Sequence, residues 1–273
     1  MVPRAGDYRV VSTSGEQLPY MLVGANGTPV EAVRDYLIEL LASDCSPLTV
    51  KSYAFDLLDW FRFLASVGVT WDQADRRHVR DWVLEARTKV NPQRRHRADR
   101  PLAGSVNLRT GKPSLRNGYA AATINHRLAV VSGFYEHARH LGQGPTIDPI
   151  PENGRRSTRS TQRRSPLEPR RPGPRGTYRQ KQEQRIPRGI PDEHFEEIFT
   201  ALRSDRDRAI VSLLVSSGAR AAELLGMTGQ DVDWGNQRVR LIGKGTRQAS
   251  WVAVSGRCTE MAGALSRAQT ANA

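Results

Sequence analysis

The stretch Ser217-Gly218-Ala219-Arg220-Ala221-Ala222-Glu223-Leu224-Leu225-Gly226-Met227 combines a glycine break, an arginine and the start of a helix. A glycine commonly ends one helix, and the spacing of apolar residues predicts another from about Ala221 to Met227. An arginine at the head of that helix can offer its planar N–H donors to a phosphate in two parallel hydrogen bonds. Taken alone, Arg220 has a more common interpretation, that of a solvated surface arginine.

The sequence on either side of this stretch predicts helices followed by strands. Upstream, apolar spacing indicates one helix opening at Asp192 and a second over Asp205–Ser217. Downstream, Arg238–Ile242 and Trp251–Val254 predict a β-hairpin around the turn Gly243-Lys244-Gly245-Thr246. This turn is not a phosphate-binding P-loop, because Arg238 occupies the position of that motif's first glycine.

The N-terminal half has the pattern of a helical domain. Residues 1–29 contain two short strand-like runs and are expected to form an arm or small extension. From Pro29 onward the apolar period is helical, and four helices are expected between residues 30 and 145. The best of them begins at Ser46-Pro47, a hydroxyl N-cap followed by proline at the first helical position, and stops at Gly68.

The charge balance points to a polyanionic partner. The 273 residues carry 41 Lys and Arg against 28 Asp and Glu, a net charge of +13. Most of this excess lies in residues 151–189, which hold few large apolar residues and are therefore expected to be a disordered or extended basic linker. Nucleic acid is the first candidate partner, although binding to ribosomes or to anionic membranes would give similar totals.

Other classes of protein find little support in the sequence. No apolar run is long enough to cross a bilayer, and no signal peptide is recognisable, so a soluble, intracellular protein of the cytoplasm is expected. Cys45 and Cys258 stand alone, without the spacing of a disulfide framework or a zinc site. We expect neither a metal nor a cofactor.

The stretch 217–227 resembles the signature of the tyrosine recombinase (phage integrase) family, in which glycine, an apolar residue, the first catalytic arginine, Glu and Leu occur in this order. Lys244, 24 positions after Arg220, looks like the lysine of the family's β-hairpin. Leu48–Leu64 is similar to a helix of the family's core-binding domain, and Ala122–Leu128 to its last DNA-facing helix. The resemblance extends from about residue 30 to 254.

This resemblance implies a fold and a set of functional residues. The expected fold is mainly α, with a four-helix SAM-like core-binding domain followed by the N-terminal part of an α+β catalytic domain. Arg220 would clamp the scissile phosphate, Lys244 would act as general acid, and Glu223 would support Arg220. Double-stranded DNA is the expected partner, together with other recombinase protomers, and the DNA-binding candidates are Thr123, Asn125, His126, Arg127, Lys51 and Arg77.

The family's later motifs are missing from this sequence. All seven tyrosines precede Arg220, and neither a histidine nor a His-x-x-Arg motif follows it. Tyr178, in the basic stretch, would be a poor nucleophile, because catalysis needs a rigidly held group. The expected chain is therefore a site-specific recombinase without its tyrosine, truncated or frameshifted. The alternatives are a noncatalytic DNA-binding regulator derived from a recombinase and a basic RNA- or ribosome-binding protein.

Five segments are expected along the chain, and whether the chain is an enzyme is left open. They are an N-terminal extension (1–29), a core-binding helical domain (30–145), a basic disordered linker (146–189), a partial catalytic domain (190–254) and an atypical tail (255–273).

Overall fold

The computed structural model describes residues 4–13, 18–89, 118–150, 176–182, 189–243 and 248–256. The chain divides into two compact units, unit 1 (Met1–Gln184) and unit 2 (Arg185–Ala273). Four predicted features lie wholly or largely outside the described residues: Lys244, the basic loop expected near 88–118, the basic linker over 146–189, and the tail after residue 256.

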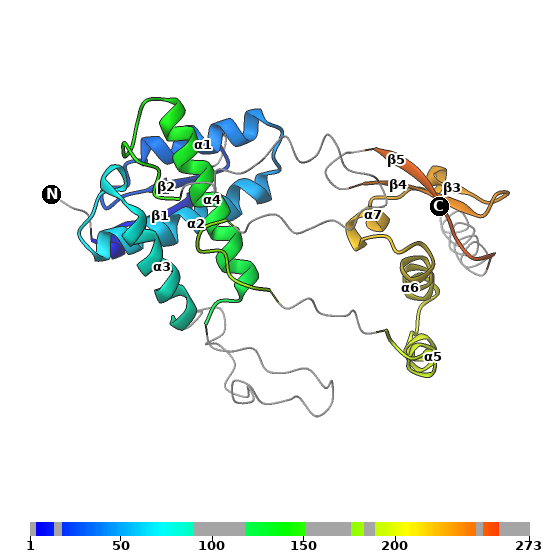
Figure 1. Cartoon of the computed structure of the whole chain (residues 1–273). Coiled ribbons are helices and arrows are strands. Elements are labelled where there is room, and N and C mark those ends of the chain that lie inside the picture. The colour runs from blue at the N-terminus through cyan, green and yellow to red at the C-terminus, as the bar shows by residue number, and fades with distance from the viewer. Residues whose placement is uncertain are drawn as a thin grey trace, which may run out of the picture. The chain divides into compact units, whose positions relative to one another are not determined.

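Unit 1 contains the four expected helices. They are α1 (Glu31–Ala42), α2 (Pro47–Ser66), α3 (Arg76–Thr88) and α4 (Ala121–His140), accompanied by the short 3-10 helices η1 (Ala5–Asp7) and η2 (Trp71–Gln73) (Figure 1). α2 contacts the other three α-helices. It begins as predicted, since the Ser46 hydroxyl accepts a hydrogen bond from the Thr49 N–H at 3.2 Å and Pro47 follows the cap.

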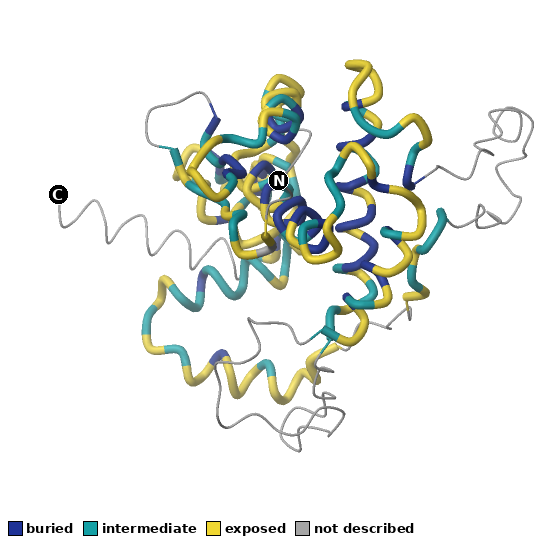
Figure 2. Tube along the Cα trace, turned by 90° about the vertical axis from the view of Figure 1, so that its left-hand side faces the viewer, coloured by how far each residue is buried: buried dark blue, intermediate teal, exposed yellow. Residues whose placement is uncertain are grey.

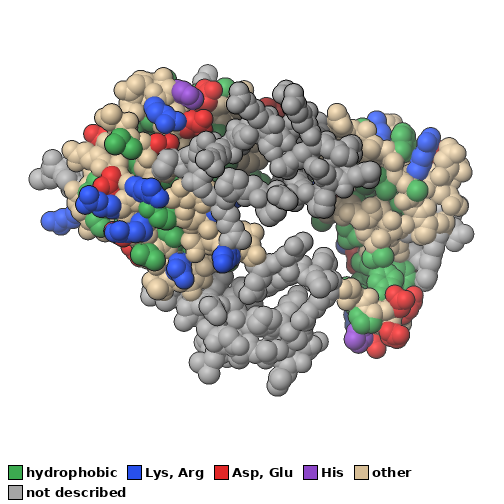
Figure 3. All heavy atoms as spheres, in the orientation of Figure 1, with side chains coloured by type: hydrophobic (Ala, Val, Ile, Leu, Met, Phe, Trp, Pro, Cys, Tyr) green, Lys and Arg blue, Asp and Glu red, His purple; other side chains and the backbone are tan. Residues whose placement is uncertain are grey.

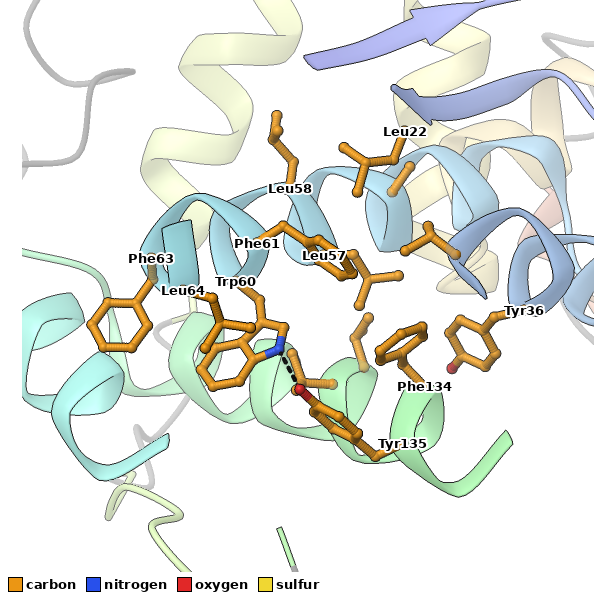
Figure 4. Packing of buried hydrophobic residues seen from close by; sticks show 14 of the residues in the cluster. Leu22, Tyr36, Leu57, Leu58, Trp60, Phe61, Phe63, Leu64, Phe134 and Tyr135 are labelled. Carbon is orange, nitrogen blue, oxygen red and sulfur yellow. Dashed lines mark hydrogen bonds between the residues drawn. The ribbon is translucent and has the colours of Figure 1, made fainter. Parts of the chain in front are cut away.

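Aromatic side chains form the centre of the unit 1 core. Trp60 and Phe134 are fully buried between α2 and α4 (Figure 4). The Trp60 Nε1–H donates to the Tyr135 hydroxyl at 3.0 Å, and that hydroxyl donates to the carbonyl oxygen of Trp71 at 3.0 Å. The buried polar atoms of both rings are thereby satisfied. Figure 2 shows the buried residues of unit 1 gathered where its helices face one another.

The N-terminal residues, expected to form an arm or small extension, pack against this core. β1 (Arg9–Ser12) and β2 (Tyr20–Val23) form an antiparallel hairpin that packs on α2. Met21 and Leu22 are buried in the same cluster as the helices. A two-stranded hairpin is barely stable alone in water, so its apolar face is buried against the helices.

Unit 2 has helices followed by an antiparallel sheet. Its elements are α5 (Asp192–Ala201), α6 (Asp205–Ser217), α7 (Ala221–Leu225), η5 (Gly229–Asp231), β3 (Val232–Asp233), β4 (Arg238–Ile242) and β5 (Ala249–Ala253). The strand order is β3-β4-β5, and Val239 lies opposite both Val232 and Val252. The predicted hairpin is therefore present, with β3 as an additional strand.

Among the described residues of unit 2, Leu224, Val239, Leu241 and Val254 form a small buried cluster with a few partly buried neighbours. Several large apolar side chains of this unit are exposed: Ile198, Val215, Leu225, Trp234, Ile242 and Trp251. Within the described parts of both units, no helix is long and apolar enough to span a membrane.

Candidate functional site

Arg220 stands between α6 and α7 and is held there by Glu223. α6 ends at Gly218, whose φ of 65° is the left-handed conformation that glycine adopts without strain. The Arg220 N–H donates to Glu223 Oε2 at 2.9 Å, and its Nη1 donates to Oε1 of the same carboxylate at 2.8 Å. One carboxylate thus orients both the backbone and the side chain of this arginine.

The exposure of the two side chains suits anion binding. The Arg220 side chain is 69% exposed, whereas that of Glu223 is 10% exposed. A guanidinium has five N–H donors, so pairing with Glu223 leaves donors that an anion can reach from solvent. α7 has only five residues, so its N-terminus contributes little attraction for an anion. The Glu223 carboxylate is the main partner that positions Arg220.

The position of α7 is fixed by the sheet. Leu224 of α7 belongs to the same buried cluster as Val239 and Leu241 of β4. The Gly243 N–H donates to the Gln248 carbonyl at 3.0 Å and so continues the pairing of β4 and β5 beyond the strands. Lys244 falls in sequence within this connection but lies outside the described residues.

Two carboxylates stabilise the sheet and occupy nearby arginines. Asp231 accepts hydrogen bonds from the Thr228 N–H at 2.8 Å and from Arg240 Nε at 2.8 Å. Both bonds lower the pKa of Asp231, and the bond from the Thr228 backbone has the larger effect. Hydrogen bonds from the Asn236 side chain and from Arg238 lower the pKa of Asp233 to about 2. Arg238 and Arg240 are therefore paired with these carboxylates, and both side chains are less exposed than that of Arg220.

In unit 1, Arg127 forms internal ion pairs, and its contact with DNA stays a prediction. Its side chain is only 10% exposed; Nη1 donates to Asp59 at 2.8 Å, and Nε lies 3.4 Å from Asp56. Its guanidinium also lies 4.0 Å from the centre of the Tyr119 ring. Burial is the largest influence on Asp56 and raises its pKa, against the opposing effects of Arg127 and His126. Arg127 thus joins α4 to α2.

Asn125 is likewise engaged inside the protein. Its residue is 6% exposed, and its amide forms a pair of hydrogen bonds with the backbone of Gln180. Asn125 Nδ2 donates to the Gln180 carbonyl at 3.0 Å, and Asn125 Oδ1 accepts from the Gln180 N–H at 2.7 Å. An amide uses the same donor and acceptor to read adenine, so Asn125 cannot read a base while Gln180 is bound.

The other four DNA-binding candidates are accessible to different degrees. His126 is exposed and lies 3.2 Å from Asp56. Thr123 is half-buried, and Lys51 is exposed with its amine over the Tyr20 ring. The Arg77 side chain is 82% exposed. Figure 3 shows Lys and Arg side chains mixed with acidic ones on the visible face of unit 1.

A basic cavity at the start of α3 was only partly anticipated. The sequence analysis names Arg77 as a candidate, but the sequence gives no sign that Tyr178 lies beside it. The cavity has a volume of about 410 Å³ and is lined by Asp75, Arg76, Arg77, Arg80, Ile147 and Tyr178. Within the described ranges, no group of three metal-ligating side chains comes together.

Family comparisons match both units. The model of the phage integrase N-terminal SAM-like domain matches residues 33–95, and that of the phage integrase family matches residues 190–270. The second match includes residues 255–270, which belong to the segment expected to be an atypical tail.

Among curated relatives, tyrosine recombinase XerC of Staphylococcus aureus is 34% identical over 73 residues, which are 25% of this chain and 24% of that protein. XerC of Mycobacterium bovis (strain BCG / Pasteur 1173P2) is 49% identical over 43 residues, which are 16% of this chain and 14% of that protein. The matched segments thus span a quarter or less of these relatives.

Similar solved structures include the Tn1549 transposon integrase in complex with circular intermediate DNA, with 12% identity and a TM-score of 0.47 over 84% of this chain and 62% of that one. XerA recombinase has 16% identity and a TM-score of 0.29 over 88% of this chain and 64% of that one. The family assignment rests on the sequence matches, because models of both domains of one family match in order along the sequence. The chain belongs to the phage integrase family of tyrosine recombinases.

Proposed function

We propose that this chain binds double-stranded DNA as part of a site-specific recombinase, and that Arg220 contacts a DNA phosphate. The observation that carries the proposal is the pair of Arg220 and Glu223, in which a largely shielded carboxylate holds an exposed guanidinium. Arginine suits phosphate because its fork of donors matches two phosphate oxygens, and its charge persists at all ordinary pH values.

The strand cleavage of the family gives these residues their roles. Attack by a tyrosine on a phosphodiester places charge on the nonbridging oxygens, which an arginine stabilises, and the 5′-oxygen leaving group needs a proton. We assign the first role to Arg220 and the second to Lys244, with Glu223 as the positioning residue for Arg220. Lysine suits proton donation because its pKa can be lowered into a useful range.

Unit 1 would supply most of the contacts to the DNA backbone. Lys51, Arg77 and His126 are exposed on helices of this unit, and Thr123 is partly accessible. The twelve Lys and Arg of residues 151–189 add positive charge that carries no sequence information. Affinity should therefore fall steeply with salt. We expect such a protein to act at the nucleoid in the cytoplasm, alongside other recombinase protomers.

For residues 1–273 alone, we propose binding without strand cleavage. All seven tyrosines belong to unit 1, and Tyr178 makes hydrogen bonds to Arg76 there. This observation favours the second candidate function, a DNA-binding regulator or accessory protein.

Duplex selection tests the proposal directly. The chain is incubated with a library of random DNA duplexes, the bound fraction is sequenced, and the best duplex is compared with RNA of equal length at several salt concentrations. We expect a preference for DNA that persists as salt rises, because base contacts add to the electrostatic attraction. Equal binding to RNA would favour a generic basic protein instead.

Two matched arginines test the role of Arg220. Arg220→Ala should weaken binding to the selected duplex about tenfold, the value of one charge-assisted contact. Arg206→Ala is the control, because Arg206 is also exposed in unit 2 and pairs with a neighbouring carboxylate. Equal affinities of the two variants would remove Arg220 from the DNA interface.

A further inference from the structure

Residues 177–180, named here the strap, lie on unit 1 although they follow the arginine-rich stretch in sequence. The backbone N–H and C=O of Gln180 both pair with the Asn125 amide of α4. The Gln180 side chain in turn donates to the Tyr178 carbonyl at 2.7 Å. Because Asn125 is buried, these hydrogen bonds are protected from competition with water.

Tyr178 provides a second attachment. Its hydroxyl accepts from Arg76 Nε at 3.1 Å and donates to the Arg76 carbonyl at 3.3 Å. Its ring faces the Arg76 guanidinium at 5.6 Å and packs against the core of unit 1. The backbone of Tyr178 has a φ of 63°, which is unfavourable for a tyrosine. Two helices, α3 and α4, therefore hold the strap.

The other end of the arginine-rich stretch is attached to the same unit. Ile150 is buried in the unit 1 core, and its N–H donates to Asp148 Oδ1 at 2.8 Å. Ile150 and the strap, which flank residues 151–175 in the sequence, therefore both lie on unit 1. The predicted linker over 146–189 thus includes a described segment, the strap, that is docked on unit 1.

We propose that the strap sets the length of the connection between the two units, and that Asn125 is the positioning residue that holds it. With the strap docked, 11 residues (181–191) separate Gln180 from α5. With the strap released, the connection starts after Ile150 and contains 41 residues (151–191). While the strap is docked, the eight arginines within 151–175 belong with unit 1 and are not part of the connection to unit 2.

The difference in length has a consequence for DNA binding, and this step rests on the proposed function. When one unit has bound, the effective concentration of the other falls with about the −3/2 power of the connecting length. Releasing the strap lengthens the connection about 3.7-fold, so the affinity for a duplex gripped by both units should fall about sevenfold by this scaling.

Docking of the strap is tested without DNA, by amide hydrogen exchange of the full-length chain. The Gln180 N–H should exchange at least about tenfold faster in Asn125→Ala and in Tyr178→Ala than in the unmodified chain. Gln182→Ala is the control, since Gln182 is an exposed neighbour of the strap. Amides of the α2 core should keep their protection in every variant, which shows that unit 1 is still folded. An unprotected Gln180 amide in the unmodified chain would overturn the proposal.

The length of the connection is tested by pulsed electron paramagnetic resonance, which measures the distance between two spin labels. The labels are attached at Glu136→Cys in unit 1 and Glu197→Cys in unit 2. Cys45→Ser and Cys258→Ser first remove the two native cysteines. Asn125→Ala should broaden the distance distribution, with a reach increased about 1.9-fold by the square-root dependence on length. An unchanged distribution would refute the tether role. If the distance distribution broadens but neither the unmodified chain nor any variant binds DNA, the result supports the role of the strap and contradicts the proposed function.

Discussion

Replacement of Arg127 by methionine should destabilise unit 1, because the guanidinium neutralises two carboxylates of α2. Asp56 is buried and Asp59 is largely shielded, and both face Arg127. Breaking a buried ion pair by removing one partner typically costs about 3–5 kcal/mol. We expect the lower end, about 3 kcal/mol, because Asp59 keeps its contacts with Trp82 and Lys89.

The loss should depend on pH in a defined direction. Burial already raises the pKa of Asp56, and removing Arg127 raises it further, since the opposing cation is lost. A folded-state pKa above the unfolded value means that protonation favours the folded state. The destabilisation is therefore fully present above the folded pKa and shrinks as the pH falls toward the unfolded value of about 3.9.

Urea unfolding of the full-length chain at pH 7.5 and at pH 4.5 measures both effects. Far-ultraviolet circular dichroism and tryptophan fluorescence follow the unfolding, and the two units are fitted as separate transitions. Arg34→Met is the matched control, because Arg34 forms an exposed pair with Glu31 and should change stability by less than about 0.5 kcal/mol. A loss for Arg127→Met that equals the control, or one that grows at pH 4.5, would refute this reasoning.

Three further predictions follow from the contacts described above. Tyr135→Phe should cost about 1–3 kcal/mol in thermal or urea unfolding, because the buried Trp60 N–H and Trp71 carbonyl lose their shared partner; a change below about 0.5 kcal/mol would contradict that network. Arg77→Ala should weaken duplex binding and reduce the salt slope by about 1, as expected for one phosphate contact, and an unchanged slope in a salt titration would place Arg77 outside the interface. The stability that Asp233 contributes to unit 2 is fully present above the unfolded pKa of about 3.9 and is lost as the pH falls through the folded value of about 2. In an acid titration, the Asp233→Asn variant should lack this loss of stability. Titration curves of the variant that coincide with those of the unmodified chain would disprove the prediction.

The helices were predictable because their signals are local. Ser46-Pro47 is the predicted cap of α2 and caps it in the structure, and the apolar period from Val50 to Leu64 marks the buried face of α2. The start of α7 at Arg220 was predictable for the same reason. Short-range rules of this kind need no knowledge of what packs against the helix.

The roles of polar residues on α4 could not be predicted in this way. Asn125 and Arg127 look like an exposed polar run in the sequence, yet both are buried. Their partners are Gln180, 55 residues later, and Asp56 and Asp59 on α2. Only the packing of α2, α4 and the strap brings these groups together, so a single sequence offers no signal for the pairing. A weak signal for the strap existed in Tyr178, an isolated aromatic residue within a basic stretch.

The most direct test of the central claim uses a labelled suicide duplex, nicked within the selected sequence so that strand cleavage traps any covalent intermediate. One sample is run on a native gel and a second on a denaturing gel. For residues 1–273 we predict a shifted band on the native gel and no protein-linked DNA on the denaturing gel. A covalent band would show that one of the seven tyrosines acts as nucleophile, and the absence of a native shift would contradict DNA binding itself.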